Sequence, residues 1–259
     1  DTEIEGGPDM SYYHGEVTAR FAVQQSLNPA AWNVYSQITP EVGLQYLKNM
    51  HFKEIKDKDY VLATSLGGFT RGASAVEMAS AYATIENDGV YREPTCIKKI
   101  VDSAENIVYM SNQEGTKIYT ETAARMMTEV LQSTVTDGIS WVAAIDGMPS
   151  AGKTGTTNEN KDGWYVGYTR YYTTSVWVGL DIPKPVEGLT GSSYPAQIWK
   201  DYMTKIHTGL TPMNFLPYAQ LSPEFVEEHY PTEPEEPVEG EKPVEGEVDE
   251  EILEEEPEV

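Results

Sequence analysis

The side chains best suited to chemistry lie together in GMPSAGKTGTT, residues 147–157. This stretch fits the phosphate-loop pattern, in which two glycines with four residues between them are followed by a lysine, here Lys153, and a threonine. Ser150 and Lys153 also fit S-x-x-K, the pattern of an acylating serine beside a lysine amine. Lys153 finally opens K-T-G, which accompanies S-x-x-K elsewhere in such enzymes. The lysine would have a different role in each case, so the elements that carry it must decide between the three patterns.

A phosphate loop needs a strand before it and a helix after it, because amides at the start of the helix bind the phosphate oxygens. Residues 155–168, GTTNENKDGWYVGY, instead contain β-branched threonines, a polar turn and a second strand. VWVGLD, which ends at Asp181, is similar to the second motif of nucleotide-binding proteins, an apolar strand that ends in an acidic residue. The short turn TRYYT joins it to the preceding strand as a hairpin, whereas nucleotide folds use parallel strands. A P-loop nucleotide-binding protein is therefore the less favoured alternative.

The S-x-x-K pair at Ser150 lacks the helix that this pattern requires. Proline, alanine, glycine and β-branched residues surround the serine and do not favour a helix. On a strand, Ser150 and Lys153 would point to opposite faces. We therefore predict that Lys153 belongs to a K-T-G motif on an edge strand.

Apolar residues at helical spacing predict four helices around this strand. The four stretches are GEVTARFAVQQSLNP (15–29), SAVEMASAYATIENDG (74–89), TETAARMMTEVLQSTV (120–135) and YPAQIWKDYMTKIH (194–207). In the first stretch, Pro29 is expected to stop the helical pattern after Asn28. The residues predicted in register are Ala124, Met127 and Leu131 in the third stretch and Ile198, Tyr202 and Ile206 in the fourth.

β-rich runs predict a hairpin in CIKKIVDSAENIVYM (96–110) and three successive strands in the second half of the chain. The strands are SAGKTGTT (150–157), GWYVGYT (163–169) and TTSVWVGLD (173–181), separated by turns rich in Asn, Asp and Gly. Strands that cluster between helices, without repeated βαβ units, indicate an α+β fold. We therefore predict an antiparallel sheet flanked by helices.

The net charge of −24 on 259 residues is divided unevenly along the chain. Residues 224–259 carry 17 acidic residues and one lysine, and PVEGE occurs there twice. Such a segment cannot bury enough apolar surface to offset its ordering entropy. We expect a folded portion at 1–222 and an acidic Pro/Glu-rich disordered tail at 223–259.

Composition also excludes several classes of protein and site. Lysines and arginines do not cluster as a nucleic-acid-binding surface requires, so we expect no nucleic-acid partner. The four histidines are dispersed and no H-E-x-x-H occurs, so we expect no metal and no cofactor. The single cysteine, Cys96, is expected to be a small buried residue. No run of 18 apolar residues predicts a membrane span, and the chain begins as a fragment of a longer protein would.

The chain resembles the C-terminal part of the transpeptidase domain of class A (bifunctional) penicillin-binding proteins. The matching stretches extend from about residue 12 to 204. They are YHGEVTARFAVQQSLNPAA, LATSLGGFTRGASAVEMASAYATIENDGV, GKTGTTNENKDGWYVGYT, TTSVWVGLD and YPAQIWKDYM. The resemblance implies the fold shared by penicillin-binding proteins and serine β-lactamases, here incomplete at its N-terminus. It also implies a serine acyltransferase that releases D-alanine from stem peptides ending in D-Ala-D-Ala, and that β-lactams acylate.

The resemblance assigns roles to two of the family's three motifs, S-x-x-K, S-x-N and K-T-G. S-x-N corresponds to Ser26-Leu27-Asn28, where Ser26 would relay a proton to the leaving amine and Asn28 would hold the substrate amide. In K-T-G, Lys153 would assist that proton transfer as a positive charge. The remaining implied roles are carboxylate binding by the hydroxyls of Thr154 and Thr156, close substrate approach at Gly155, and an oxyanion donor in the Thr156 N–H.

The sequence departs from the family at the nucleophile. S-x-x-K occurs only at Ser150, so we expect the true nucleophile in the N-terminal remainder of the parent chain, upstream of Asp1. The E-x-x-L-N context of a deacylating β-lactamase glutamate is absent between S-x-N and K-T-G. Transfer to an amine is therefore favoured over hydrolysis. We expect the parent at the extracytoplasmic face of a bacterial membrane, anchored by an N-terminal span. A non-catalytic peptidoglycan- or β-lactam-binding sensor is the alternative.

Overall fold

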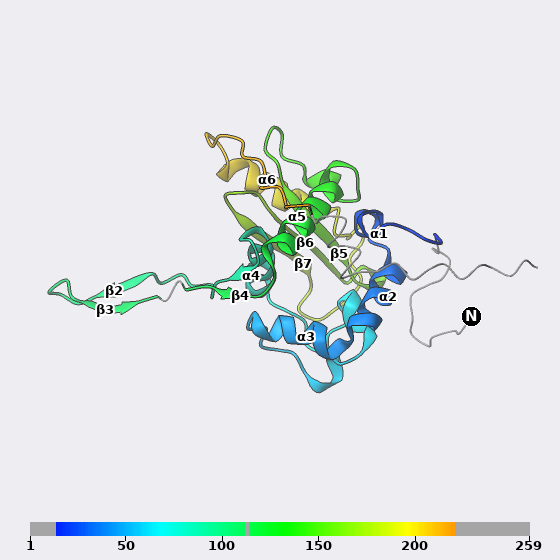
Figure 1. The fold of residues 1–259 in the computed structure, drawn as a ribbon, viewed down its shortest axis with the longest axis horizontal. Coiled ribbons are helices and arrows are strands. Elements are labelled where there is room, and N and C mark those ends of the chain that lie inside the picture. Colours follow the sequence, from blue (N-terminus) through cyan, green and yellow to red (C-terminus); the bar gives the residue numbers. More distant parts are fainter. Residues whose placement is uncertain (1–13, 112–113, 221–259) are drawn as a thin grey trace, which may run out of the picture. The chain divides into compact units, whose positions relative to one another are not determined.

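Among the residues that the structure describes, the strand with the K-T-G motif pairs with a neighbour on one side only, so the motif lies on an edge strand (Figure 1). The computed structural model describes residues 14–111 and 114–220, and the predicted tail at 223–259 lies outside them. The sheet has the order β5-β6-β7, and both pairings are antiparallel. Its strands are β5 (Ala151–Thr156), β6 (Asp162–Tyr168) and β7 (Thr173–Gly179). The predicted α+β fold with an antiparallel sheet is thus confirmed.

Helices cover both faces of this sheet, which lies in a unit that ends at Ala219. On one face, Tyr165 packs edge-on against Trp199 of α6 (Tyr194–Ile206), with ring centroids 5.1 Å apart. On the other face, Tyr168 packs with Leu131 of α5 (Glu121–Thr136), and its hydroxyl lies 2.9 Å from Thr128 Oγ1. Because alternate strand residues face opposite sides, β6 supplies both layers of the core.

The helices predicted from 74–89 and 120–135 form where their capping residues indicate. In α4 (Ala75–Glu86), the Ser74 hydroxyl accepts from Glu77 N–H while the Glu77 carboxylate accepts from Ser74 N–H, which completes a capping box. The Thr120 hydroxyl caps α5 by accepting from Ala123 N–H, without a reciprocal bond. Ala124 and Leu131 are buried, whereas Met127, predicted in register with them, is 41% exposed.

α6 also forms as predicted, but it buries a different face. Ile198 and Tyr202 are 49% and 51% exposed, while Trp199 and Met203 are fully buried. α6 has two adjacent apolar stripes, one with Ile198 and Tyr202 and the other with Trp199 and Met203. The stripe with the indole is buried because it removes more apolar surface from water.

The prediction that the helical pattern stops at Pro29 is wrong. α1 (Ala19–Gln25) ends just before Ser26, and α2 (Asn28–Ile38) starts only two residues later. Pro29 lies in the first turn of α2, where its missing N–H costs nothing. α3 (Pro40–Asn49) follows and starts with proline in the same way.

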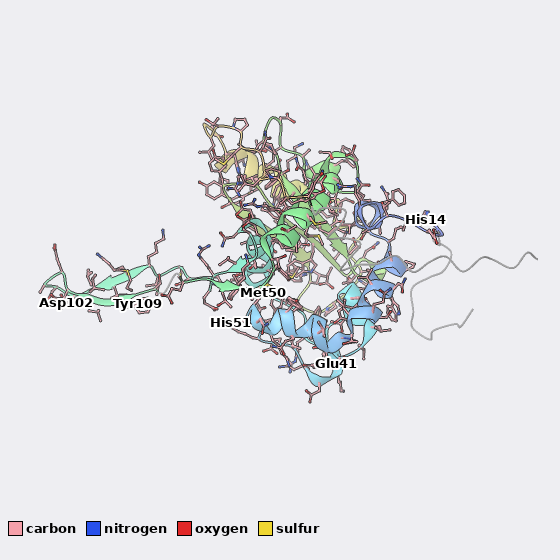
Figure 2. The ribbon with its side chains drawn as sticks, viewed as in Figure 1. His14, Glu41, Met50, His51, Asp102 and Tyr109 are labelled. Atoms are coloured by element: carbon pink, nitrogen blue, oxygen red, sulfur yellow. The ribbon has the colours of Figure 1, made fainter. Side chains whose placement is uncertain are left out.

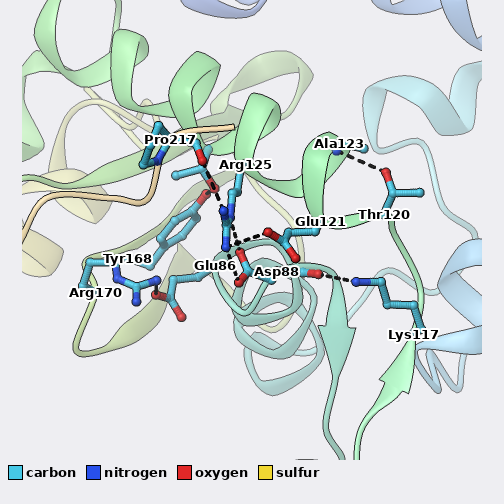
Figure 3. Close-up of polar contacts among 11 residues, drawn as sticks. Glu86, Asp88, Lys117, Thr120, Glu121, Ala123, Arg125, Tyr168, Arg170 and Pro217 are labelled. Carbon is cyan, nitrogen blue, oxygen red and sulfur yellow. Dashed lines mark hydrogen bonds and ion pairs between the residues drawn. The ribbon is translucent and has the colours of Figure 1, made fainter. Parts of the chain in front are cut away.

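An arginine joins the end of α4 to α5 (Figure 3). Arg125 donates from Nε and Nη2 to the Asp88 carboxylate at 2.8 and 3.0 Å, and it pairs with Glu121 at 2.9 Å. Its Nη1 also donates to Pro217 O at 3.2 Å. Asp88 has φ 53°, and the bidentate pair holds it in this left-handed turn.

The predicted hairpin is present as a two-stranded ribbon of β2 (Lys99–Val101) and β3 (Ile107–Met110) (Figure 2). A second small ladder pairs β1 (Val90–Tyr91) with β4 (Thr116–Lys117). Every residue of β2 and β3 is exposed. Cys96, just before this ribbon, is also exposed, so its predicted burial is wrong.

Candidate active site: a cleft beside the K-T-G strand

Lys153 contacts a residue 127 positions earlier in the chain. Its Nζ donates to Ser26 Oγ at 2.7 Å and to Thr154 O at 3.1 Å. Ser26 is the C-terminal cap of α1 and has left-handed φ and ψ of 55° and 47°. Its own N–H donates to Ala22 O and Val23 O, which holds this unusual turn in place. The helix end thus fixes the backbone from which the Ser26 hydroxyl meets the ammonium.

Alternation along β5 separates its functional groups, as the sequence predicts. Ala151 packs with Leu131 of α5, so Lys153, two residues on, shares the face that α5 and α1 cover. Thr156 lies on the opposite face, where its hydroxyl accepts from Gly191 N–H at 2.9 Å. The hydroxyl hydrogen of Thr156 remains available to a ligand, because that contact uses only an acceptor lone pair.

The environment of Lys153 changes its acidity. Burial lowers the pKa of the Lys153 ammonium to about 8, because the charged form loses hydration. The ammonium therefore holds or releases its proton close to neutral pH. A group with such a pKa can give a proton to a neighbouring hydroxyl or take one from it.

These residues line a single cleft of ≈2050 Å³. All six predicted site residues border it, namely Ser26, Asn28, Lys153, Thr154, Gly155 and Thr156. Ser150 is buried at 4% exposure and does not border the cleft, in line with the interpretation of its S-x-x-K pattern as a coincidence. Met127, predicted in register with Ala124 and Leu131, also borders the cleft.

A buried carboxylate shapes another wall of the cleft. Asp59, fully buried at the end of η2 (Asp57–Asp59), accepts from the N–H groups of Lys56 and Thr70 at 2.7 Å and from the Thr70 hydroxyl at 2.6 Å. Burial alone would raise the pKa of Asp59, but these hydrogen bonds lower it below its ordinary value. The bonds close a loop around η3 (Leu62–Leu66), whose side chains border the cleft. No sequence pattern singled out Asp59.

A buried threonine supports the K-T-G strand from α5. Thr134 Oγ1 lies 2.6 Å from Gly152 O, directly before Lys153, and 2.8 Å from Leu131 O. Thr134 is fully buried. Sequence reasoning missed it, because a threonine inside a helix carries no periodic signal of a contact with a strand.

α2 borders the cleft with apolar side chains that remain incompletely covered. None of its residues is buried, and Val34 and Ile38 are 58% and 46% exposed. Trp32 Nε1 is shielded from water without a hydrogen-bond partner among the described residues. Buried indole N–H groups usually donate a hydrogen bond, so the α2 side of the cleft lacks an acceptor for Trp32 Nε1 among the described residues.

The phosphate-loop alternative finds no support in the structure. After Thr156 the chain makes only the one-turn η5 (Asn158–Asn160) and then enters β6. No α-helix therefore comes directly after the strand that carries Lys153. In the part of the chain that the structure describes, no His, Cys, Asp and Glu side chains form a group able to hold a metal. In that same part, no helix is long and apolar enough to cross a membrane.

Known proteins with similar sequences are penicillin-binding proteins. The chain is 35% identical to penicillin-binding protein 4 of Bacillus subtilis (strain 168), over 72% of this chain and 30% of that protein. It is 36% identical to penicillin-binding protein 1F of the same organism, over 75% of this chain and 28% of that protein. The chain is 32% identical to penicillin-binding protein 1A of Clostridium acetobutylicum, over 78% of this chain and 25% of that protein. The chain thus spans about 30% or less of the length of these relatives.

Solved structures agree with the fold. PonA1 from Mycobacterium tuberculosis superposes with a TM-score of 0.72 at 24% identity, over 81% of this chain and 62% of that one. A second structure, of PonA1 in complex with penicillin V, also superposes with a TM-score of 0.72, over 85% of this chain and 63% of that one. Residues 6–204 match the family described as the penicillin binding protein transpeptidase domain. This match covers more than half of the sequence and includes Ser26 and Lys153 of the cleft, so the chain belongs to the penicillin-binding protein transpeptidase domain family.

Proposed function

We propose that this chain is part of a peptidoglycan D,D-transpeptidase that cross-links stem peptides through a serine acyl-enzyme and is acylated by β-lactams. The observation that carries the proposal is the 2.7 Å contact between Lys153 Nζ and Ser26 Oγ beside an edge strand and an open cleft. Family membership supports the reaction class. The penicillin V complex of PonA1, a protein of similar fold, supports the class of inhibitor.

In this proposal Ser26 and Lys153 move the proton. The hydroxyl oxygen of a serine attacks the carbonyl of the D-Ala-D-Ala bond and D-alanine leaves as the C–N bond breaks. The proton that the serine hydroxyl loses is balanced by the proton that the leaving amine takes up through Ser26. The Lys153 ammonium, with its pKa lowered to about 8, gives and recovers that proton near neutral pH. The acyl group then passes to the amine of a second stem peptide, which loses a proton as it attacks.

The other cleft residues bind the substrate. Asn28 holds its backbone amide, and the hydroxyls of Thr154 and Thr156 bind its terminal carboxylate. Gly155 has no side chain to obstruct a peptide strand along β5. The Thr156 N–H is one of two oxyanion donors, a contribution of roughly 3–4 kcal/mol to the transition state.

The attacking serine belongs, in this proposal, to an S-x-x-K motif in an upstream part of the parent protein. The cleft supports it, because α2 buries none of its residues and Trp32 Nε1 lacks a partner among the described residues. An apolar segment from upstream would cover this wall and bring its serine toward Ser26 and Lys153. That parent would act at the extracytoplasmic face of the membrane, anchored by a segment outside this chain.

The test is the rate at which fluorescent penicillin labels the longer protein that includes the upstream region. Lys153→Ala should slow acylation by about 10²- to 10⁴-fold, because general acid–base assistance is lost while the oxyanion N–H stays. Lys184→Ala, an exposed lysine away from the cleft lining, serves as the matched control. A thermal melt shows that both variants are folded. Acylation of Lys153→Ala at the control rate would remove Lys153 from the proton path and refute the proposed mechanism.

A further inference from the structure

The β2–β3 ribbon exposes apolar side chains on both of its faces. Ile100 and Tyr109 are cross-strand partners on one face and are 45% and 43% exposed. Val108 and Met110, which alternate with Tyr109 along β3, are 67% and 57% exposed. A two-stranded hairpin by itself is marginally stable in water. Additional strand pairing would therefore stabilise this ribbon.

The open edge of β2 offers regularly spaced backbone groups. Ser111 N–H donates to Lys98 O, and Asp102 N–H donates to Asn106 O, so Lys98 and Asp102 direct backbone groups toward β3. Antiparallel strands alternate these directions residue by residue. Lys99 and Val101 therefore direct their N–H and C=O groups away from β3. The register shift at Val101 leaves this alternation intact, because the extra residue lies in β3.

The sequence of β2 is complementary to itself in the antiparallel direction. Around Ile100 as a centre, Lys98 lies two residues before and Asp102 two residues after. If two β2 strands pair about a two-fold axis at Ile100, each Lys98 lies opposite the Asp102 of the other strand. Lys99 and Val101 then face each other as hydrogen-bonded pairs. We propose that this edge of β2 binds a second copy of the same chain and forms a continuous four-stranded sheet β3-β2-β2-β3.

The charges of β2 make this register selective. Lysines on an edge strand normally discourage pairing with other strands. In the two-fold register the Lys98 ammonium meets a carboxylate, whereas most other registers leave it opposite an apolar residue or another lysine. Asp102 is negative at neutral pH, because hydrogen bonds from Asn106 and Ala104 hold its pKa below the ordinary value. The structure gives Lys98 no ion-pair partner within the residues it describes.

Cysteine cross-linking tests the two-fold axis. Ile100 would lie opposite itself as a non-hydrogen-bonded pair, with Cα atoms about 4.5 Å apart, a separation that a disulfide can span. In a Cys96→Ser background, Ile100→Cys should form a disulfide-linked dimer under mild oxidation at about 0.1 mM protein. Val108→Cys lies on the outer strand β3 and is the matched control; although Val108 is more exposed than Ile100, at 67% against 45%, this variant should yield at least about tenfold less dimer. Equal yields from both variants, or no dimer from either, would overturn the proposal.

Sedimentation equilibrium tests the charge pairing on chains that keep the native ribbon core. Short strands bury little surface, so self-association should be weak and require concentrations up to about 0.5 mM. Lys98→Glu should raise the dimer dissociation constant by about tenfold, because each two-fold pair becomes acid against acid. Lys184→Glu makes the same charge change elsewhere and should leave the constant unchanged. A chain that stays monomeric would refute the proposal, and so would a ribbon that instead binds another segment of the longer parent protein. Equal dimer dissociation constants for Lys98→Glu and Lys184→Glu would refute it as well.

Discussion

At the scale of a single residue, Lys153 shows how one position serves both the fold and the chemistry. Its ammonium leaves water to lie beside Ser26, and the hydration that it loses lowers its pKa to about 8. The same desolvation makes the charged lysine a destabilising group in the folded chain below that pH. The role in proton transfer that we propose for Lys153 thus comes at a cost to the stability of the fold.

The pH dependence of stability should reveal this cost. Between about pH 8 and pH 10.5 the unfolded chain keeps the Lys153 proton while the folded chain loses it, so the free energy of unfolding contributed by this group rises with pH. Lys153→Met should therefore be more stable than the unmodified chain at pH 7, by about 1–2 kcal/mol. That advantage should shrink toward pH 10.5.

Urea unfolding at pH 7, 8, 9 and 10 measures the difference between variant and unmodified chain at each pH, which cancels the titration of the other lysines and tyrosines. Lys184→Met, at an exposed position, should show no such trend. A stability difference for Lys153→Met that does not vary with pH would mean that the folded chain leaves the acidity of this lysine unchanged.

At the scale of secondary structure, the K-T-G strand depends on a helix that touches no substrate. β5 has a strand on one side only, and the Thr134 hydroxyl of α5 holds Gly152 O at 2.6 Å. Ala151 and Leu131 pack against each other in the same region. The position of Lys153 is thus set by α5 as well as by pairing with β6.

Removal of that hydroxyl should loosen the strand. Thr134→Val keeps the shape of the side chain but leaves Gly152 O without its buried partner, at a cost of about 1–3 kcal/mol in unfolding free energy. Thr136→Val, two residues on along α5 and exposed, should change the stability by less than about 0.5 kcal/mol. Denaturant unfolding of both variants decides the matter. Equal stability of the two would show that α5 does not support β5 through Thr134.

Helix positions were more predictable than helix faces. The hydroxyls of Ser74 and Thr120 cap the starts of α4 and α5, and capping is a local interaction. Met127 and Ile198 were predicted in register with other apolar residues of their helices and are exposed, because the partner surface selects which apolar residues are covered. Pro29 was interpreted as a helix stop although proline is equally suited to begin a helix.

At the scale of the whole molecule, this chain brings Ser26 and Lys153 together beside one cleft, and its only S-x-x-K serine, Ser150, is buried. Incubated with penicillin, it should therefore gain no covalent adduct, which intact-protein mass spectrometry measures. Ser150 is buried, and Ser26, which Lys153 contacts, is the residue that we propose as the proton relay. The longer protein with its upstream region is the positive control. A stoichiometric mass increase on Ser26 or Ser150 would contradict the assignment of the nucleophile to another segment.

The sequence by itself determined the family resemblance, the antiparallel strands and the motifs Ser26-Leu27-Asn28 and Lys153-Thr154-Gly155. These features follow from local rules, because alternation, turn residues and fixed motif spacings are properties of short segments. It also determined that the phosphate-loop pattern lacks its helix, and it predicted the hairpin that became β2 and β3.

Only the tertiary structure decided how close the two motifs come and what surrounds them. The 2.7 Å contact between Lys153 and Ser26 joins positions 127 residues apart, and no local rule sets such a distance. The buried supports Asp59 and Thr134 have no sequence signature, because their partners are backbone groups that any residue could supply. The lowered pKa of Lys153 likewise arises from desolvation, which exists only once distant segments exclude water from the same place.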